Sequence, residues 1–167
     1  MLDAASFKQA MGSFPTGVTI AATIGADGKP AGLTVSSFAS VSLEPPLVLF
    51  CPSKKAECHD AFRAADHFSI SILPAGEESL AQRFSTRGVH KFQGDEFIEG
   101  EHGLPLVRSA VASLVCRKSA EYEAGDHMIV VGEVLAVRIG AHSDSMVYYR
   151  RNYWRFAAGA QQLARST

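Results

Sequence analysis

Residues 32–51 restrict the fold of this chain more than any other stretch of its sequence. They read as two buried β-strands, because β-branched and aromatic residues such as Val48 and Phe50 dominate them. Five hydroxyl side chains interrupt this apolar pattern: Thr34, Ser36, Ser37, Ser40 and Ser42. A buried hydroxyl without a partner costs about 1–3 kcal/mol, so each needs one. Two interpretations stay open: hydroxyl-to-backbone bonds around a bend, or a polar wall around an oxygen-rich cofactor.

Strand patterns continue over most of the chain, with short helices between them. Hydrophobic periodicity predicts strands over 18–24, 31–37, 47–51, 67–73, 111–117, 128–138 and 146–149, and helices over 3–11, 58–65 and 78–84. The stretch 85–103 contains few strand formers, which predicts a long loop or a partly helical excursion. Gly132 interrupts the longest strand and predicts a bulge where it bends. The expected fold class is therefore mainly β, an antiparallel barrel with a few short helices.

Size and charge exclude several kinds of protein. A chain of 167 residues has the length of one domain. Its net charge of −1 lacks the clustered basic excess that nucleic-acid binding requires. It has no apolar run of about 20 residues and no secretory leader, so we expect a cytoplasmic protein outside the membrane. The three cysteines lack CxxC spacing, which predicts reduced thiols rather than disulfides or a zinc site.

Two segments carry groups suited to a charged ligand. Cys51-Pro-Ser-Lys-Lys55 lies between an expected strand and an expected helix, and its hydroxyl, ammonium and backbone N–H groups suit a phosphate. The alternative is a solvated surface patch. Gly125-Asp-His127 places an imidazole beside an acid at the start of a strand, where it can contact a ligand. The alternative is a turn in which Asp126 caps backbone N–H groups.

Other common sites are absent from the sequence. Neither GxGxxG nor GxxxxGK[ST] occurs at a strand end, which argues against a Rossmann site or a P-loop. The histidines show no HExxH spacing, so no metal site is expected, and GxSxG is missing. An aromatic and basic cluster at 148–154 could pack on the barrel, contact a dimer partner or stack on a ligand.

Several motifs occur in an order and spacing that match a known family: Phe14-Pro-Thr-Gly-Val-Thr19, residues 32–51, Leu80-Ala-Gln-Arg-Phe84, Lys91-Phe92, Gly125-Asp-His127 and Tyr148-Tyr149. The chain resembles the short-chain flavin reductases, the reductase components of two-component flavin monooxygenases. The resemblance covers nearly the whole chain. It implies a single flavin reductase-like domain over residues 1–167, folded as the FMN-binding split barrel, an antiparallel split β-barrel.

The resemblance also implies a site. The flavin ring and ribityl chain would lie along Thr34, Val35, Ser36, Ser37, Ser40 and Ser42. Its phosphate would bind at Cys51, Ser53, Lys54 and Lys55, and the far side of the pocket would hold Phe84, Ser85, Lys91 and Phe92. His127 would be the catalytic residue that faces the nicotinamide, with Tyr149 also at the pyridine nucleotide.

The implied activity is that of an NAD(P)H:flavin oxidoreductase. NADH or NADPH would reduce FMN or FAD, and the reduced flavin would pass to a partner oxygenase. Such proteins are usually homodimers. Two alternatives stay open: a flavoprotein that reduces another acceptor, such as a corrinoid of the cobalamin pathway, and a non-catalytic split barrel that binds flavin or haem.

Overall fold

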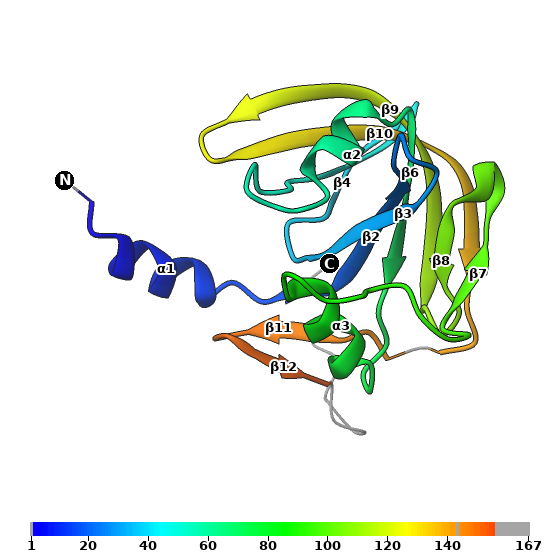
Figure 1. The fold of residues 1–167 in the computed structure, drawn as a ribbon. Helices are drawn as coiled ribbons and strands as arrows, with labels where there is room; N and C mark the ends of the chain where they lie inside the picture. The colour runs from blue at the N-terminus through cyan, green and yellow to red at the C-terminus, as the bar shows by residue number, and fades with distance from the viewer. Residues whose placement is uncertain (1, 143, 156–167) are drawn as a thin grey trace.

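A seven-stranded antiparallel sheet forms the body of the computed structural model, which describes residues 2–142 and 144–155 (Figure 1). Its strands are β2 (Thr19–Ile24), β3 (Pro30–Val35), β4 (Ala39–Leu43), β5 (Pro46–Phe50), β6 (His67–Ile72), β9 (Ala112–Ala124) and β10 (His127–Ile139). They are arranged in the order β3-β2-β6-β9-β10-β5-β4. The predicted mainly β class is confirmed.

The two edges of this sheet are joined by a very short link. Only residues 36–38 separate β3 from β4, so these edge strands approach within about 14 Å where they are connected. The sheet must therefore curl back on itself, which produces the predicted antiparallel split β-barrel, with a gap in the backbone ladder between β3 and β4. The chain crosses this gap at the hydroxyl-rich stretch.

Smaller elements flank the barrel (Figure 1). A three-stranded sheet contains β1 (Thr16–Gly17), β11 (Val147–Tyr149) and β12 (Asn152–Trp154), and a hairpin contains β7 (Phe97–Glu99) and β8 (Pro105–Val107) with the 3-10 helix η1 (Glu101–Gly103) between them. The helices are α1 (Ala4–Gly12), α2 (His59–Ala64) and α3 (Glu78–Ser85). The three predicted helices are confirmed. In the described part of the chain, no helix combines the length and apolar character that a membrane span needs.

Apolar side chains fill the barrel and the spaces beneath its flanking elements. The interior cluster includes Phe50, Phe62, Phe68, Ile70 and Val130. A second cluster lies beneath α3 and β11, and includes Ile20, Leu73, Leu80, Phe84 and Met146. A third joins the β7–β8 hairpin to β9 through Leu104, Leu106 and Val115. The second cluster fixes α3 beside β3, where the candidate site lies.

Three expectations about individual strands were wrong. Residues 32–51 form three strands rather than two buried ones, and the middle strand, β4, is an exposed edge on which Leu43 is 90% exposed. The stretch 85–103 contains strand β7, which its sequence did not predict, although the 3-10 helix η1 at its end agrees with the predicted partly helical excursion. Strand β9 continues to Ala124, because β10 pairs with it along its whole length. In each case backbone pairing with the next strand along the chain, rather than the residue pattern of the strand itself, decided the outcome.

The predicted bulge is present at Gly132. The pairing of β10 with β9 shifts register between Val131 and Gly132. A Cβ atom at Gly132 would lie 2.6 Å from the ring carbon Cε1 of Phe68, closer than two non-bonded carbon atoms can approach. Phe68 packs against Phe50 in the barrel interior, with ring centroids 5.1 Å apart. Glycine is therefore required here for close packing between the bent strand and an aromatic side chain.

Gly132→Ala is expected to lower the free energy of unfolding by about 2 kcal/mol, because the new methyl group overpacks the Phe68 ring. Urea denaturation should show a lower midpoint with an unchanged slope. Gly17→Ala is the matched control, since a Cβ atom at Gly17 would meet no neighbour within 4 Å, and it should change stability by less than about 0.5 kcal/mol. Equal effects of the two variants would contradict this account.

Candidate cofactor site

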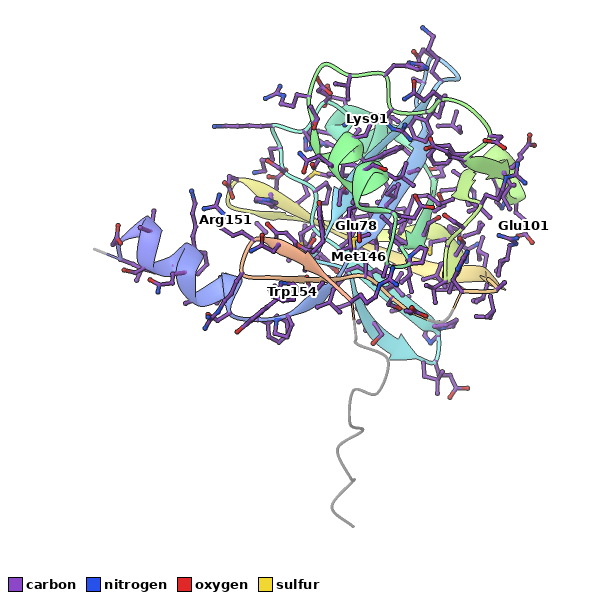
Figure 2. All side chains as sticks on the ribbon, turned by 90° about the horizontal axis from the view of Figure 1, so that it is seen from below. Glu78, Lys91, Glu101, Met146, Arg151 and Trp154 are labelled. Atoms are coloured by element: carbon purple, nitrogen blue, oxygen red, sulfur yellow. The ribbon has the colours of Figure 1, made fainter. Side chains whose placement is uncertain are left out.

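The end of β3 lines a hollow of about 270 Å³ beside α3 and the β11–β12 hairpin. Its walls are Val18, Thr34, Ser36, Gln82, Ser85, Tyr148, Arg151 and Tyr153. Three residues predicted to bind a cofactor therefore lie around one space. Figure 2 shows Arg151 on the side of the body that faces α1, with Lys91 beyond α3. Val35 is buried and packs in the barrel interior instead.

The hydroxyls of residues 34–42 support both interpretations of the sequence, namely hydroxyl-to-backbone bonding and a polar wall around a cofactor. Thr34 Oγ1 donates to the carbonyl oxygen of Ala81 at 2.6 Å. Ser37 Oγ accepts from the backbone N–H of Cys51 at 2.9 Å, and Ser42 Oγ accepts from that of Glu44 at 3.3 Å. Hydroxyl-to-backbone bonding thus accounts for these three hydroxyls. Their remaining lone pairs, together with the exposed Ser36, can still accept hydrogen bonds from a ligand.

Residues 51–55, here called the lysine-rich loop, form one structural unit with the Gly125-Asp-His127 motif. Ser53 makes a β-bridge with His127, and the backbone N–H of Lys54 donates to the carbonyl oxygen of Asp126 at 2.9 Å. The bond between Ser37 and Cys51 connects this unit to the end of β3. Segments that are far apart in sequence therefore meet next to the hydroxyl-rich stretch.

The two lysines of this loop differ in their ion pairs. The ammonium of Lys54 pairs with the carboxylate of Glu123 on β9, and this hydrogen bond lowers the pKa of Glu123. Lys55 is exposed, and no carboxylate within residues 2–142 and 144–155 pairs with its side chain. The charge of Lys55 is therefore the more available of the two for an anionic ligand.

His127 is partly exposed and oriented by its neighbour. Its Nδ1 lies 2.8 Å from Oδ1 of Asp126, and this hydrogen bond lowers the pKa of Asp126. Asp126 is thus ionised at neutral pH and can only accept, so Nδ1 carries the hydrogen. In the neutral imidazole, Nε2 is then an acceptor, suited to an amide N–H of a ligand.

A second hollow, of about 500 Å³, lies on the other side of α3 between the start of β3 and the segment 89–92. Lys91 and Phe92 line it together with Gly32. The Phe92 ring packs edge-on against Phe84, with centroids 5.0 Å apart. Phe84 itself is 1% exposed, so its present contacts are with the core of the protein.

Five of the predicted site residues line these two hollows: Thr34, Ser36, Ser85, Lys91 and Phe92. The other predicted residues do not line them, and three of these lie on strands β4 and β11. Ser40 and Ser42 are on β4, at the opposite edge of the sheet from β3. Tyr149 lines a separate, smaller hollow with Trp154, whereas Tyr148 borders the same space as Thr34. Successive side chains of a strand point to opposite faces, so only one of the two adjacent tyrosines can face β3. The aromatic pair was the signal that could have identified Tyr148.

The cysteines are free thiols, as predicted. Burial raises the pKa of Cys116 to about 12 and also raises that of Cys58, so neither is a thiolate at neutral pH. In the described part of the chain, His, Cys, Asp and Glu side chains do not gather in groups of three or more that could hold a metal ion.

Comparison with known proteins gives a consistent result. The family model of the flavin reductase like domain matches residues 11–157. The FMN reductase (NADH) SmoA of Agrobacterium fabrum is 45% identical over 139 residues, which are 83% of this chain and 77% of that protein. HsaB of Rhodococcus jostii, the reductase subunit of a flavin-dependent monooxygenase, is 35% identical over 91% of this chain and 77% of its own.

A solved structure is similar over nearly the whole chain. The NADH:FAD oxidoreductase SgcE6 of Streptomyces globisporus, in complex with NAD and FAD fragments, has a TM-score of 0.88 and 39% sequence identity. The similarity covers 95% of this chain and 96% of that one. The barrel and its flanking elements thus have a counterpart in a protein of known activity.

Proposed function

The chain belongs to the flavin reductase like domain family, and from this premise we propose that it transfers hydride from NADH or NADPH to FMN or FAD. The family predicted from the sequence is confirmed, and so is the enzyme class, NAD(P)H:flavin oxidoreductase. The proposed domain spans residues 1–167. The observation that carries the proposal is the contact between the lysine-rich loop and His127, beside the hydroxyl-bearing end of β3.

The residues present fit a flavin and a nicotinamide. A flavin has a flat apolar body with a polar edge and, in FMN, a terminal phosphate. The hollow beside β3 offers apolar and hydroxyl-bearing walls, and Lys55 adds an exposed positive charge. When both ligands are bound, they supply a direct hydride transfer between two stacked rings. The protein then has to bind, orient and shield them.

Each part of the site has a distinct proposed role. Thr34 and Ser36 hold the polar edge of the flavin through their free lone pairs. Ser53 and Lys55 bind its phosphate, and Lys91 supplies a second positive charge from the far side of α3. His127, with Nδ1 fixed by Asp126, accepts from the carboxamide of the nicotinamide at Nε2. This contact selects the orientation in which the nicotinamide faces the flavin.

We also propose that the product, reduced flavin, is used by a partner oxygenase. HsaB is the reductase subunit of a flavin-dependent monooxygenase, and other relatives are named as reductase components. The candidate hollows are open rather than closed cavities, which suits a flavin that leaves after reduction. The free thiols support a cytoplasmic location, where cysteines stay reduced.

We propose a homodimer in which a second copy covers α1. This nine-residue helix buries none of its side chains and projects away from the barrel (Figure 1). Phe7, Met11 and Phe14 are 51%, 55% and 70% exposed. A helix this short is marginal in water on its own. The same three side chains line a hollow that includes Ser36, so a second copy seated there also completes a wall of the cofactor site.

Sedimentation equilibrium tests the dimer. The wild type is expected to be dimeric, and Phe7→Ser with Met11→Ser is expected to give monomers that bind flavin more weakly, because one wall of the hollow is lost. Lys29→Ser, in the β2–β3 turn, is the control and should stay dimeric. A monomeric wild type, or a dimer that survives both substitutions in α1, would contradict the proposal.

The activity is tested by anaerobic stopped-flow spectroscopy at about 450 nm, where oxidised flavin absorbs. NADH or NADPH should bleach FMN or FAD in the presence of the protein, with many turnovers of excess flavin. Comparing the rates for the four combinations of nucleotide and flavin identifies the preferred flavin and the preferred nucleotide. A corrinoid added as acceptor provides the critical comparison. Reduction of the corrinoid without turnover of free flavin would overturn the proposal.

A further inference from the structure

Glu57 links two segments of the candidate site that have no backbone pairing with each other. It lies two residues after Lys55, just before α2. Its Oε1 accepts from the backbone N–H of Gly88 at 2.8 Å, and its Oε2 lies 3.9 Å from Nζ of Lys91. One carboxylate therefore contacts both ends of residues 88–91.

The segment it contacts depends on side chains for its position. Residues 86–96 form neither helix nor strand. At its far end the segment is held by the ion pair of Arg83 with Glu96 and by the backbone N–H of Arg108, which donates to the carbonyl oxygen of Glu96. Gly88 has a φ of 70°, in the left-handed region, so the chain turns sharply there. The hydrogen bond from Gly88 to Glu57 fixes this turn.

Lys91 needs the negative charge that Glu57 provides. Its side chain is only 14% exposed, and its Nζ donates to the carbonyl oxygen of Gly32 at 3.3 Å. An ammonium that has lost most of its water is unfavourable unless an opposite charge lies nearby. The carbonyl of Gly32 is neutral, whereas Glu57 offers a carboxylate. Glu57 thus favours the conformation in which Lys91 reaches across to the middle of β3.

We propose that Glu57 is a positioning residue for flavin binding, which acts by holding Lys91 against β3 and by fixing the turn at Gly88. It ties the segment 88–91 to the lysine-rich loop, so that the two positively charged parts of the site keep a constant separation. The inference rests on the proposed function, because it takes Lys91 as a flavin-binding residue. Glu57 itself does not touch the flavin in this account.

Two substitutions of Glu57 separate its two contacts. Glu57→Ala removes both, and is expected to raise the KM for FMN about tenfold while kcat changes less than about threefold. Glu57→Gln keeps an acceptor for the backbone N–H of Gly88 but loses the charge. It should therefore raise the KM for FMN only about threefold. Glu99→Gln, on the β7–β8 hairpin, is the matched control and should leave both constants unchanged. Thermal unfolding checks that each variant is folded.

A double-mutant cycle with Lys91→Met tests whether Glu57 acts through Lys91. Alone, Lys91→Met should raise the KM for FMN, and in its background the further effect of Glu57→Ala should fall to about threefold or less. Fully additive effects, or an unchanged KM in folded Glu57→Ala, would overturn the inference while leaving the activity in place. Failure of the wild type to reduce flavin would instead overturn the proposed function on which the inference rests.

Discussion

His127→Ala is expected to lower the rate of flavin reduction by NAD(P)H about 100-fold, while flavin affinity stays within about threefold of the wild type. The imidazole is fixed by Asp126 at Nδ1, which leaves Nε2 free to orient the carboxamide of the nicotinamide. Without that contact the nicotinamide binds in several orientations, and in few of them does the nicotinamide ring stack on the flavin ring. Anaerobic stopped-flow spectroscopy gives the rate, and quenching of flavin fluorescence gives the affinity.

Two further variants decide whether orientation is the cause. Asp126→Asn keeps a hydrogen-bond partner for the ring but removes the charge, so its rate should fall between those of the wild type and His127→Ala. His142→Ala removes an exposed imidazole from the loop after β10 and should have no effect. If His127→Ala weakened flavin binding as much as it slowed reduction, His127 would be part of the flavin site instead.

The sequence predicted most of the barrel because its strands are rich in β-branched and aromatic residues, with turn residues between them. The residue types of β6 alternate, although the strand is buried on both faces, and glycine at position 132 marked the bulge in β10. The exposed edge strand β4 and the polar end of β9 were not predicted correctly, because their sequences carry little information on burial. Their conformation comes from the hairpin ladders with β5 and β10, and such pairing depends on the partner strand as much as on the residues of the strand itself.

The site residues were predicted by resemblance, and their assigned roles stay predictions. What the sequence could not provide is the pairing of side chains across the fold. Lys54 and Lys55 are equivalent in sequence, but Glu123 on β9 engages only the first. Likewise Tyr148 and Tyr149 are adjacent, and the alternation of β11 turns only Tyr148 toward Thr34. The structure therefore distinguishes adjacent residues of the same type, which a sequence motif alone cannot rank as ligand contacts.

Replacing both Lys54 and Lys55 with methionine is expected to raise the KM for FMN about 100-fold and to leave the KM for riboflavin within about twofold. Riboflavin has the same ring system and ribityl chain but no phosphate, so it reports every contact except the one tested. Lys55→Met alone should account for most of the effect, because Lys54 is already paired with Glu123. Steady-state assays at constant ionic strength give the KM for each of the two flavins with the wild type and with each variant.

Arg138→Gln is the control for the loss of positive charge, since this exposed residue lies near the far end of β10 from His127. It should leave both KM values unchanged, because screening at physiological salt limits long-range attraction to about 8 Å. A rise in KM for riboflavin that equals the rise for FMN would place the lysines at the ring rather than at the phosphate. If Lys54→Met alone reproduced the double variant, Glu123 would not hold Lys54 away from the ligand, and the distinction drawn between the two lysines would be wrong.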